Sequence, residues 1–287
     1  MPQFDIGCVH SAMGNHEAAL SHFQTCLLQR RKLLGGHVDV ANTLYEMGSI
    51  YSQQDRVQLA VKCLTESDRI WKAKLRNNEK MTSVLLLSAK LWKSLQCYRA
   101  AEENFEQALE QAIGLYGQQH ELVASVLLSL GELLQEISQI QQALFCFDES
   151  IQVRTALYGP DSPSVAQVEY SKGVALLFHG DFEDASNCLN RALAIRQEKL
   201  GPMDNAVGDT LNTIGFLQLR IGNISGQEAL DPLTKALEIR REVGNKSKVV
   251  STLQNIASVY KKKETVCLLH GNTCRNSCCS PRRVWVE

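Results

Sequence analysis

The chain repeats a pattern of small and large residues at an interval of about 42 positions, and this period constrains its fold more than any other feature. One register holds only glycine or alanine, at spacings of 41 or 42: Gly7, Gly48, Ala89, Gly131, Gly173, Gly215 and Ala257. A second register holds alanine in six places: Ala19, Ala60, Ala101, Ala143, Ala185 and Ala229. Repetition of this length indicates stacked copies of one supersecondary unit.

Each alanine of the second register is followed by a large apolar residue four positions later and by a small residue three positions after that. The large residues are Phe23, Leu64, Phe105, Phe147, Leu189 and Leu233, and the small ones are Cys26, Ser67, Ala108, Ser150, Ala192 and Ala236. Positions i, i+4 and i+7 lie on one face of a helix, and small side chains allow two helices to approach closely. Each repeat is therefore predicted to be a helical hairpin.

In the fifth repeat the predicted helices cover residues 164–178 and 182–200, and we expect Asp181 to cap the second one. Gly117, Gly159 and Gly201 come directly after successive second helices, where glycine is expected to adopt the left-handed conformation. Pro163 suits the first position of the helix that follows. These residues form the predicted joints between hairpins.

The sixth repeat is irregular, because two extra residues lie between Gly215 and Ala229. Ser225 and Glu228 can form a capping box, which places Pro232 inside the second helix and predicts a kink. Alternatively, that helix begins at Asp231–Pro232. The sequence leaves both alternatives open.

The pattern of small, large and small residues resembles the tetratricopeptide repeat. The long period, joints such as LYGPDSPSVA (157–166) and runs such as LNRALAIRQEKLG (189–201) are similar to the repeats of kinesin light chains and nephrocystin-3-type proteins. The resemblance covers residues 3–261 and implies an all-α, right-handed superhelical solenoid of about six and a half hairpins. We expect the solenoid to span residues 1–263, followed by a disordered cysteine-rich tail, residues 264–287. The cut-off pattern at both ends indicates a fragment or variant product of a longer protein.

Composition and motifs argue against several classes of function. The formal charge of −1 gives no basic surface for nucleic acid, and no apolar run is long enough to span a membrane. Ten cysteines without a secretion signal favour a reducing compartment, so we expect a cytoplasmic protein. No catalytic or nucleotide-binding motif occurs, and the spacing of His270, Cys274 and Cys278 does not match a zinc knuckle. We therefore expect no enzyme activity, cofactor or metal.

The resemblance implies that the first helices line a concave groove that holds a peptide. Projection onto this chain selects eight residues: Tyr170, Val174, Phe178, Asn212, Phe216, Arg220, Gln254 and Lys261. Aromatic residues and arginine are common anchors of interfaces, and cations favour acidic ligands. The predicted function is that of an adaptor scaffold whose partner presents a bulky apolar residue flanked by acids.

The sequence leaves two alternatives open. The aromatic residues of the predicted site can instead pack between neighbouring repeats, since apolar stripes usually belong to a core. The chain can also be a self-associating assembly component, of the kinesin light chain-like or ciliary kind that the resemblance implies.

Overall fold

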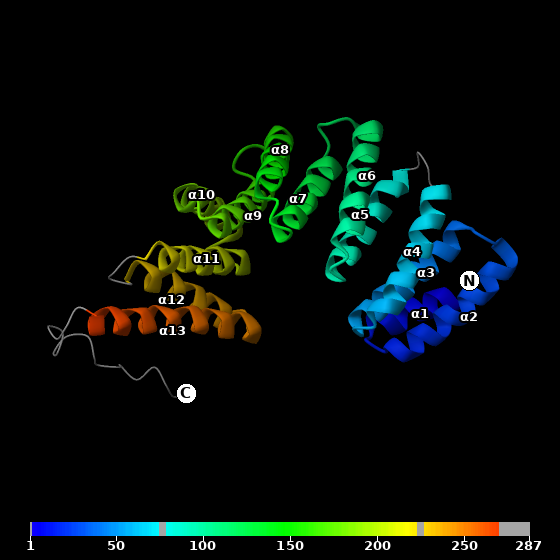
Figure 1. Cartoon of the computed structure of the whole chain (residues 1–287), viewed down its shortest axis with the longest axis horizontal. Helices are drawn as coiled ribbons and strands as arrows, with labels where there is room; N and C mark the ends of the chain where they lie inside the picture. The colour runs from blue at the N-terminus through cyan, green and yellow to red at the C-terminus, as the bar shows by residue number, and fades with distance from the viewer. Residues whose placement is uncertain (1, 75–78, 223–226, 270–287) are drawn as a thin grey trace. The chain divides into compact units, whose positions relative to one another are not determined.

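The computed structural model describes residues 2–74, 79–222 and 227–269, and within these ranges it contains thirteen α-helices and no strand. Successive helices pair as hairpins (Figure 1). The chain forms two compact units, Met1–Gly159 with α1 to α8 and Pro160–Glu287 with α9 to α13. Six hairpins followed by the single helix α13 confirm the predicted all-α architecture of about six and a half repeats.

The first helices of the repeats are α1 (Pro2–Ala12), α3 (Val38–Gln53), α5 (Glu79–Ser94), α7 (Glu121–Glu136), α9 (Pro163–His179), α11 (Asn205–Ile221) and α13 (Lys246–Leu269). The second helices are α2 (His16–Leu34), α4 (Val57–Lys74), α6 (Tyr98–Tyr116), α8 (Ile140–Tyr158), α10 (Phe182–Leu200) and α12 (Gln227–Glu242). Within each unit, every helix packs against the helix before and after it in the chain.

The predicted small and large positions meet inside each hairpin. A Cβ atom added to Gly131 would lie 2.7 Å from the Phe147 ring, and one added to Gly173 would lie 2.8 Å from Cγ of Leu189. Phe147 and Leu189 are fully buried. Because real Cβ atoms do not approach other atoms this closely, the glycines set how near the two helices can lie.

The third small position also has a defined role where it is serine. Ser67 donates a hydrogen bond of 2.8 Å to the carbonyl of Ala41, and Ser150 donates one of 2.8 Å to that of Ala124. Both serines are fully buried, so the hydroxyl needs this partner. Alanine fits the same position in other repeats because it has no polar group to satisfy.

The joints between hairpins agree with the prediction in part. Gly117, Gly159 and Gly201 have φ of 77°, 85° and 94°, but their ψ values of 175°, 161° and 157° are extended. The predicted left-handed α conformation is therefore wrong at these positions. At each joint the combination of positive φ and extended ψ is one that essentially only glycine adopts. These backbone angles end the second helix and turn the chain away from the helix axis.

The two predicted helix starts differ in outcome. Pro163 begins α9, as expected, and Ser162 directly before it caps the helix by accepting a hydrogen bond of 3.3 Å from the Val165 amide. Asp181 occupies the N-cap position of α10, but its side chain forms no capping hydrogen bond, so that prediction is wrong. Its ψ of 69° does not give the extended conformation that Asp204 uses (ψ 145°) to accept from the amide of Ala206.

The sixth repeat follows the first of the two alternatives. Helix α12 begins at Gln227 and contains Pro232, which cannot donate to the carbonyl of Glu228. Ser225 lies outside the described residues. At the C-terminal end α13 continues to Leu269, and the predicted tail residues from 270 on, with His270, Cys274 and Cys278, also lie outside them.

Candidate functional site

All eight residues of the predicted site lie in the second unit, on the three first helices α9, α11 and α13. Helix α11 contacts both α9 and α13. The residues occupy recurring places relative to the glycine or alanine register. Tyr170, Asn212 and Gln254 come three positions before it, Val174 and Phe216 one position after it, and Phe178 and Arg220 five positions after it. Equivalent positions of neighbouring helices thus contribute to one face.

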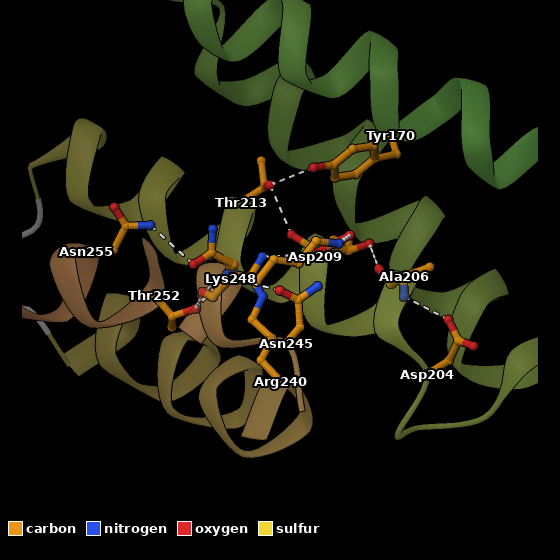
Figure 2. A network of polar contacts seen from close by, with 12 residues as sticks. Tyr170, Asp204, Ala206, Asp209, Thr213, Arg240, Asn245, Lys248, Thr252 and Asn255 are labelled. Carbon is orange, nitrogen blue, oxygen red and sulfur yellow. Dashed lines mark hydrogen bonds and ion pairs between the residues drawn. The ribbon is translucent and has the colours of Figure 1, made fainter. Parts of the chain in front are cut away.

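Tyr170 packs on α10 of its own hairpin, and its hydroxyl reaches the next repeat. Its hydroxyl lies 3.1 Å from Oγ1 of Thr213 in α11, as Figure 2 shows. The guanidinium carbon of Arg196 lies 4.6 Å from the centre of the tyrosine ring, and the ring also packs against Ala166 and Ile195. Tyr170 is therefore engaged within the fold, but the alternative of packing between repeats describes only its hydroxyl, which contacts Thr213.

Asn212 is also engaged in the stack. Its Oδ1 accepts a hydrogen bond of 3.2 Å from the side-chain nitrogen Nδ2 of Asn255 in α13. The N–H groups of the Asn212 side chain can still donate to a ligand carbonyl. Gln254, one residue before Asn255, is exposed on α13.

Phe178 and Phe216 form the apolar part of the face. Their ring centroids lie 6.4 Å apart at an angle of 43°, within the range of tilted aromatic pairs. Phe178 is 61% exposed although it ends a well-packed helix, whereas Phe216 and Val174 are half-buried. The structure thus brings together two of the predicted anchors, Phe178 and Phe216, and Phe178 presents a large apolar surface to solvent.

Exposed cations lie on α11, the helix that carries Phe216, and on α13. Arg220 is exposed near the end of α11, at the position equivalent to Phe178, and Lys261 is exposed on α13. Lys262 donates a hydrogen bond of 2.9 Å to the carbonyl of Leu219, which lies in the last turn of α11. This contact satisfies a carbonyl at a helix end and draws Lys262 towards α11.

An acidic residue of α11, Asp209, is held in a polar network. Asp209 accepts from Nη2 of Arg240 at 2.9 Å and from Nζ of Lys248 at 2.6 Å, and Figure 2 shows this network between α11, α12 and α13. Its carboxylate is therefore committed to joining the sixth and seventh repeats.

Sequence reasoning missed a recurring arginine that joins one hairpin to the next. Arg30, Arg196 and Arg240 all come eleven positions after the register alanine, and all are at least 93% buried. In each case Nη1 donates to a carbonyl in the first turn of the next first helix and to a threonine hydroxyl one turn later. The acceptors are Asp39 and Thr43, Ala206 and Thr210, and Lys248 and Thr252. Each arginine comes eleven positions after its register alanine, and each threonine comes five positions before the glycine or alanine register of the next helix, so the sequence contains the signal.

Arg154 occupies the same position in the fourth repeat. It is 3% exposed and forms an ion pair of 3.3 Å with Glu121. Burial lowers the pKa of Arg154, and it also lowers the pKa of Arg196, but both guanidinium groups remain within reach of acidic or polar partners. These buried charges are structural, because each is enclosed between helices.

The described residues contain no group of three or more histidine, cysteine or acidic side chains that could hold a metal ion. The face of α9, α11 and α13 thus presents one exposed and one half-buried phenylalanine, side-chain amides and exposed cations, which are groups common at protein interfaces.

Comparison with known proteins gives the family. A scan of protein families matches the tetratricopeptide repeat over residues 4–73, 84–156 and 141–198, more than half of the chain. The comparison with curated proteins gave no match. The matched family describes a repeat, and no enzyme family is indicated.

Solved structures show the same fold at low sequence identity. BtubC (BKLC) from P. vanneervenii has a TM-score of 0.64 and 21% identity, over 80% of this chain and 92% of that one. A putative kinesin light chain from Podosopora anserina, with nearly identical TPR-like repeats, has a TM-score of 0.60 and 18% identity, over 73% and 99%. The apo form of RapI has a TM-score of 0.64 and 9% identity, over 92% and 97%.

These neighbours agree with the resemblance to kinesin light chain-type repeats in the sequence. Over the part of the chain that the structure describes, none of the helices combines the length and the apolar character needed to cross a membrane. With its paired helices, its repeating small and large positions and its family match, the chain belongs to the tetratricopeptide repeat family.

Proposed function

We propose that the chain is a non-catalytic adaptor that binds a peptide segment of a partner protein on the face of α9, α11 and α13. The observation that carries this proposal is the aromatic pair Phe178–Phe216, in which a phenylalanine that is 61% exposed is held at the end of an ordered helix. A large apolar side chain that the fold does not need to bury is typical of an interface anchor.

The charges near this pair indicate the partner's chemistry. Arg220 is exposed on α11, the helix of Phe216, and Lys261 is exposed on α13. A ligand with a bulky apolar residue can contact Phe178 and Phe216, and flanking acidic residues would meet the cations. Asn212 and Gln254 can hold the ligand's main chain without selecting its sequence. We expect this encounter in the cytoplasm, the compartment that ten cysteines favour.

The test uses the full chain and a fluorescein-labelled peptide with one tryptophan between runs of glutamate. We expect saturable binding by fluorescence anisotropy, weakened at least about fivefold by Phe178→Ala and by Arg220→Glu. A peptide with lysine in place of glutamate should bind more weakly. The control is Phe145→Ala, which removes an equally exposed aromatic residue from the other unit. Equal affinity of wild type, Phe178→Ala and Arg220→Glu would contradict the proposal.

A second candidate, self-association, is favoured by exposed apolar residues on the first and last helices. Val9 on α1 is 53% exposed and Met13, directly after α1, is 69% exposed; on α13, Val250 is 53% and Tyr260 55% exposed. Two copies that stack these faces would bury them. Sedimentation equilibrium over a hundredfold range of protein concentration, about 1 to 100 μM, separates the candidates. A constant monomer mass excludes self-association, and a mass that rises with concentration supports it.

A further inference from the structure

The first unit has an exposed aromatic residue at a position that is polar in every other hairpin. Phe145 comes two positions after the register alanine of α8 and is 65% exposed. The equivalent residues of the other five second helices are all polar and exposed: Ser21, Lys62, Glu103, Asn187 and Asp231. The outer side of a second helix is normally solvated, so packing within this fold gives no reason for a phenylalanine there.

Phe145 borders an open pocket of about 420 Å³ formed by α6, α7 and α8. Leu130 and Leu134 of α7 line it and are 7% and 4% exposed. Cys146 and Phe145 of α8 form one side, and Glu102 and Glu106 of α6 form the other. The pocket therefore combines an apolar lining with an acidic rim, and its volume is sufficient for a large side chain.

The charge around this pocket is strongly one-sided. Residues 98–158 contain nine acidic side chains, two arginines and no lysine, a formal charge of −7, whereas the whole chain carries −1. Neither arginine neutralises the rim. Arg99 pairs with Glu103 at 3.2 Å, and Arg154 is buried beside Glu121.

The two rim residues differ from these paired acids. Glu102 and Glu106 form no ion pair with any other described residue. Surface charges of one sign around an apolar pocket attract a partner of the opposite sign and orient it before contact.

We propose that this pocket is a second docking site, and that it binds a segment of a partner protein that places an aliphatic or aromatic side chain beside lysine or arginine. The apolar side chain would enter between Phe145 and the two leucines, and the basic residue would meet Glu102 and Glu106. This chemistry is opposite in charge to that of the ligand proposed for the second unit. The site therefore does not depend on the face of α9, α11 and α13.

The first experiment selects peptides from a random twelve-residue library displayed on phage, using the full chain as bait. Wild type and three variants are compared: Phe145→Glu, Glu106→Lys and the control Asn187→Glu. The control puts the same charge at the equivalent, exposed position of the second unit. Because Phe145 and Glu106 are exposed, we expect all four proteins to have the same unfolding midpoint in urea.

The expected result is a set of net-basic peptides with an aliphatic or aromatic residue, retained by wild type and Asn187→Glu and lost with Phe145→Glu. No enrichment, or equal enrichment with Phe145→Glu, would overturn the proposal. Enrichment of acidic peptides that depends on Phe145 would also overturn it. Glu106→Lys leaves the apolar lining intact, so its loss of the same peptides isolates the contribution of charge.

The second experiment measures the affinity of the most enriched basic peptide, labelled with fluorescein, by anisotropy. We expect Phe145→Glu and Glu106→Lys each to weaken binding at least about fivefold, with no change in Asn187→Glu. Raising salt from about 50 to about 300 mM should weaken wild-type binding, because exposed charges are then screened. Affinity that is insensitive to both salt and Glu106→Lys would contradict an electrostatic docking site.

Discussion

At the scale of single residues, close contact between a glycine and a large side chain decides how the hairpins pack. The large side chain belongs to the second helix and fills the space that the missing Cβ leaves on the first. The same pair recurs in chemically different forms, with phenylalanine in some repeats and leucine in others. This fit requires complementary volumes rather than particular side chains.

Substitution of Gly131 by alanine tests that contact. The new Cβ would lie 2.7 Å from the buried Phe147 ring, so we expect the free energy of unfolding in urea to fall by about 1–3 kcal/mol. The matched control is Gly114→Ala in α6, where a Cβ would meet nothing within 4 Å. That change should stabilise the protein by about 0.5–1 kcal/mol, because alanine favours helix. Stabilisation by both substitutions would contradict the proposed role of the glycine register.

The thiol of Cys146 gives a prediction about pH. Burial, aided by Glu149, raises the pKa of Cys146 from 9.0 to about 11 in the folded protein. The folded state therefore holds this proton more tightly than the unfolded state. Its contribution to stability is complete below pH 9 and is lost as the pH rises to about 11.

Urea unfolding at pH 8, 9, 10 and 11 measures this effect. The decline in the free energy of unfolding between about pH 9 and 11 should be smaller in Cys146→Ala than in wild type. Parallel declines in the two proteins would show that this thiol does not titrate as its burial requires.

At the scale of helices, the register predicted the elements closely. The predicted helix at 182–200 is observed as Phe182–Leu200, and the one at 164–178 as Pro163–His179. The repeating small and large residues predict the helices well, because the spacing of residues on one helix face follows from helix geometry alone. The error at Asp181 depends on a backbone angle, and residue type alone does not determine it.

The candidate site was harder to predict than the helices. Phe178 and Phe216 lie together as expected, but Tyr170 lies against Arg196 and Thr213 of neighbouring helices. Whether an apolar residue on a first helix faces solvent or the next repeat depends on the side chains opposite it, which a single helix face does not reveal. The sequence analysis did not predict the pocket beside Phe145, because it was based on positions where the repeats are alike, and Phe145 is a position where one repeat differs.

The arginine that joins successive hairpins yields a prediction at this scale. Arg196 is 7% exposed and donates to Oγ1 of Thr210 at 2.7 Å. Arg196→Met removes the donor to the buried Thr210 hydroxyl and the contact with the Tyr170 ring, and it should cost about 2–4 kcal/mol of unfolding free energy. Arg99→Met, at a guanidinium that is 93% exposed, should cost less than about 0.5 kcal/mol.

A double-mutant cycle isolates the contact itself. We expect Arg196→Met and Thr210→Val to couple by about 0.5–3 kcal/mol, because each removes the other's partner. Additive effects of the two substitutions would mean that the arginine does not join the hairpins through this threonine.

At the scale of the whole molecule, stability is expected to be local. Stacked repeats contact only their neighbours, so damage to one hairpin spreads only to adjacent ones. We expect Leu189→Ala, which empties a fully buried position of α10, to speed amide hydrogen exchange in α9, α10 and α11. Exchange in α3 and α4 of the first unit should stay unchanged. Uniform acceleration along the chain would indicate a single cooperative core instead.

The central functional claim is that the face of α9, α11 and α13 holds a partner peptide, with Phe178 and Phe216 as its anchors. Hydrogen exchange of the full chain with and without the tryptophan–glutamate peptide tests it most directly. The account predicts slower exchange confined to α9, α11 and α13, strongest around residues 174–180 and 212–220, and absent in Phe178→Ala. Protection confined to α6 and α8, or no protection at a saturating peptide concentration, would contradict it.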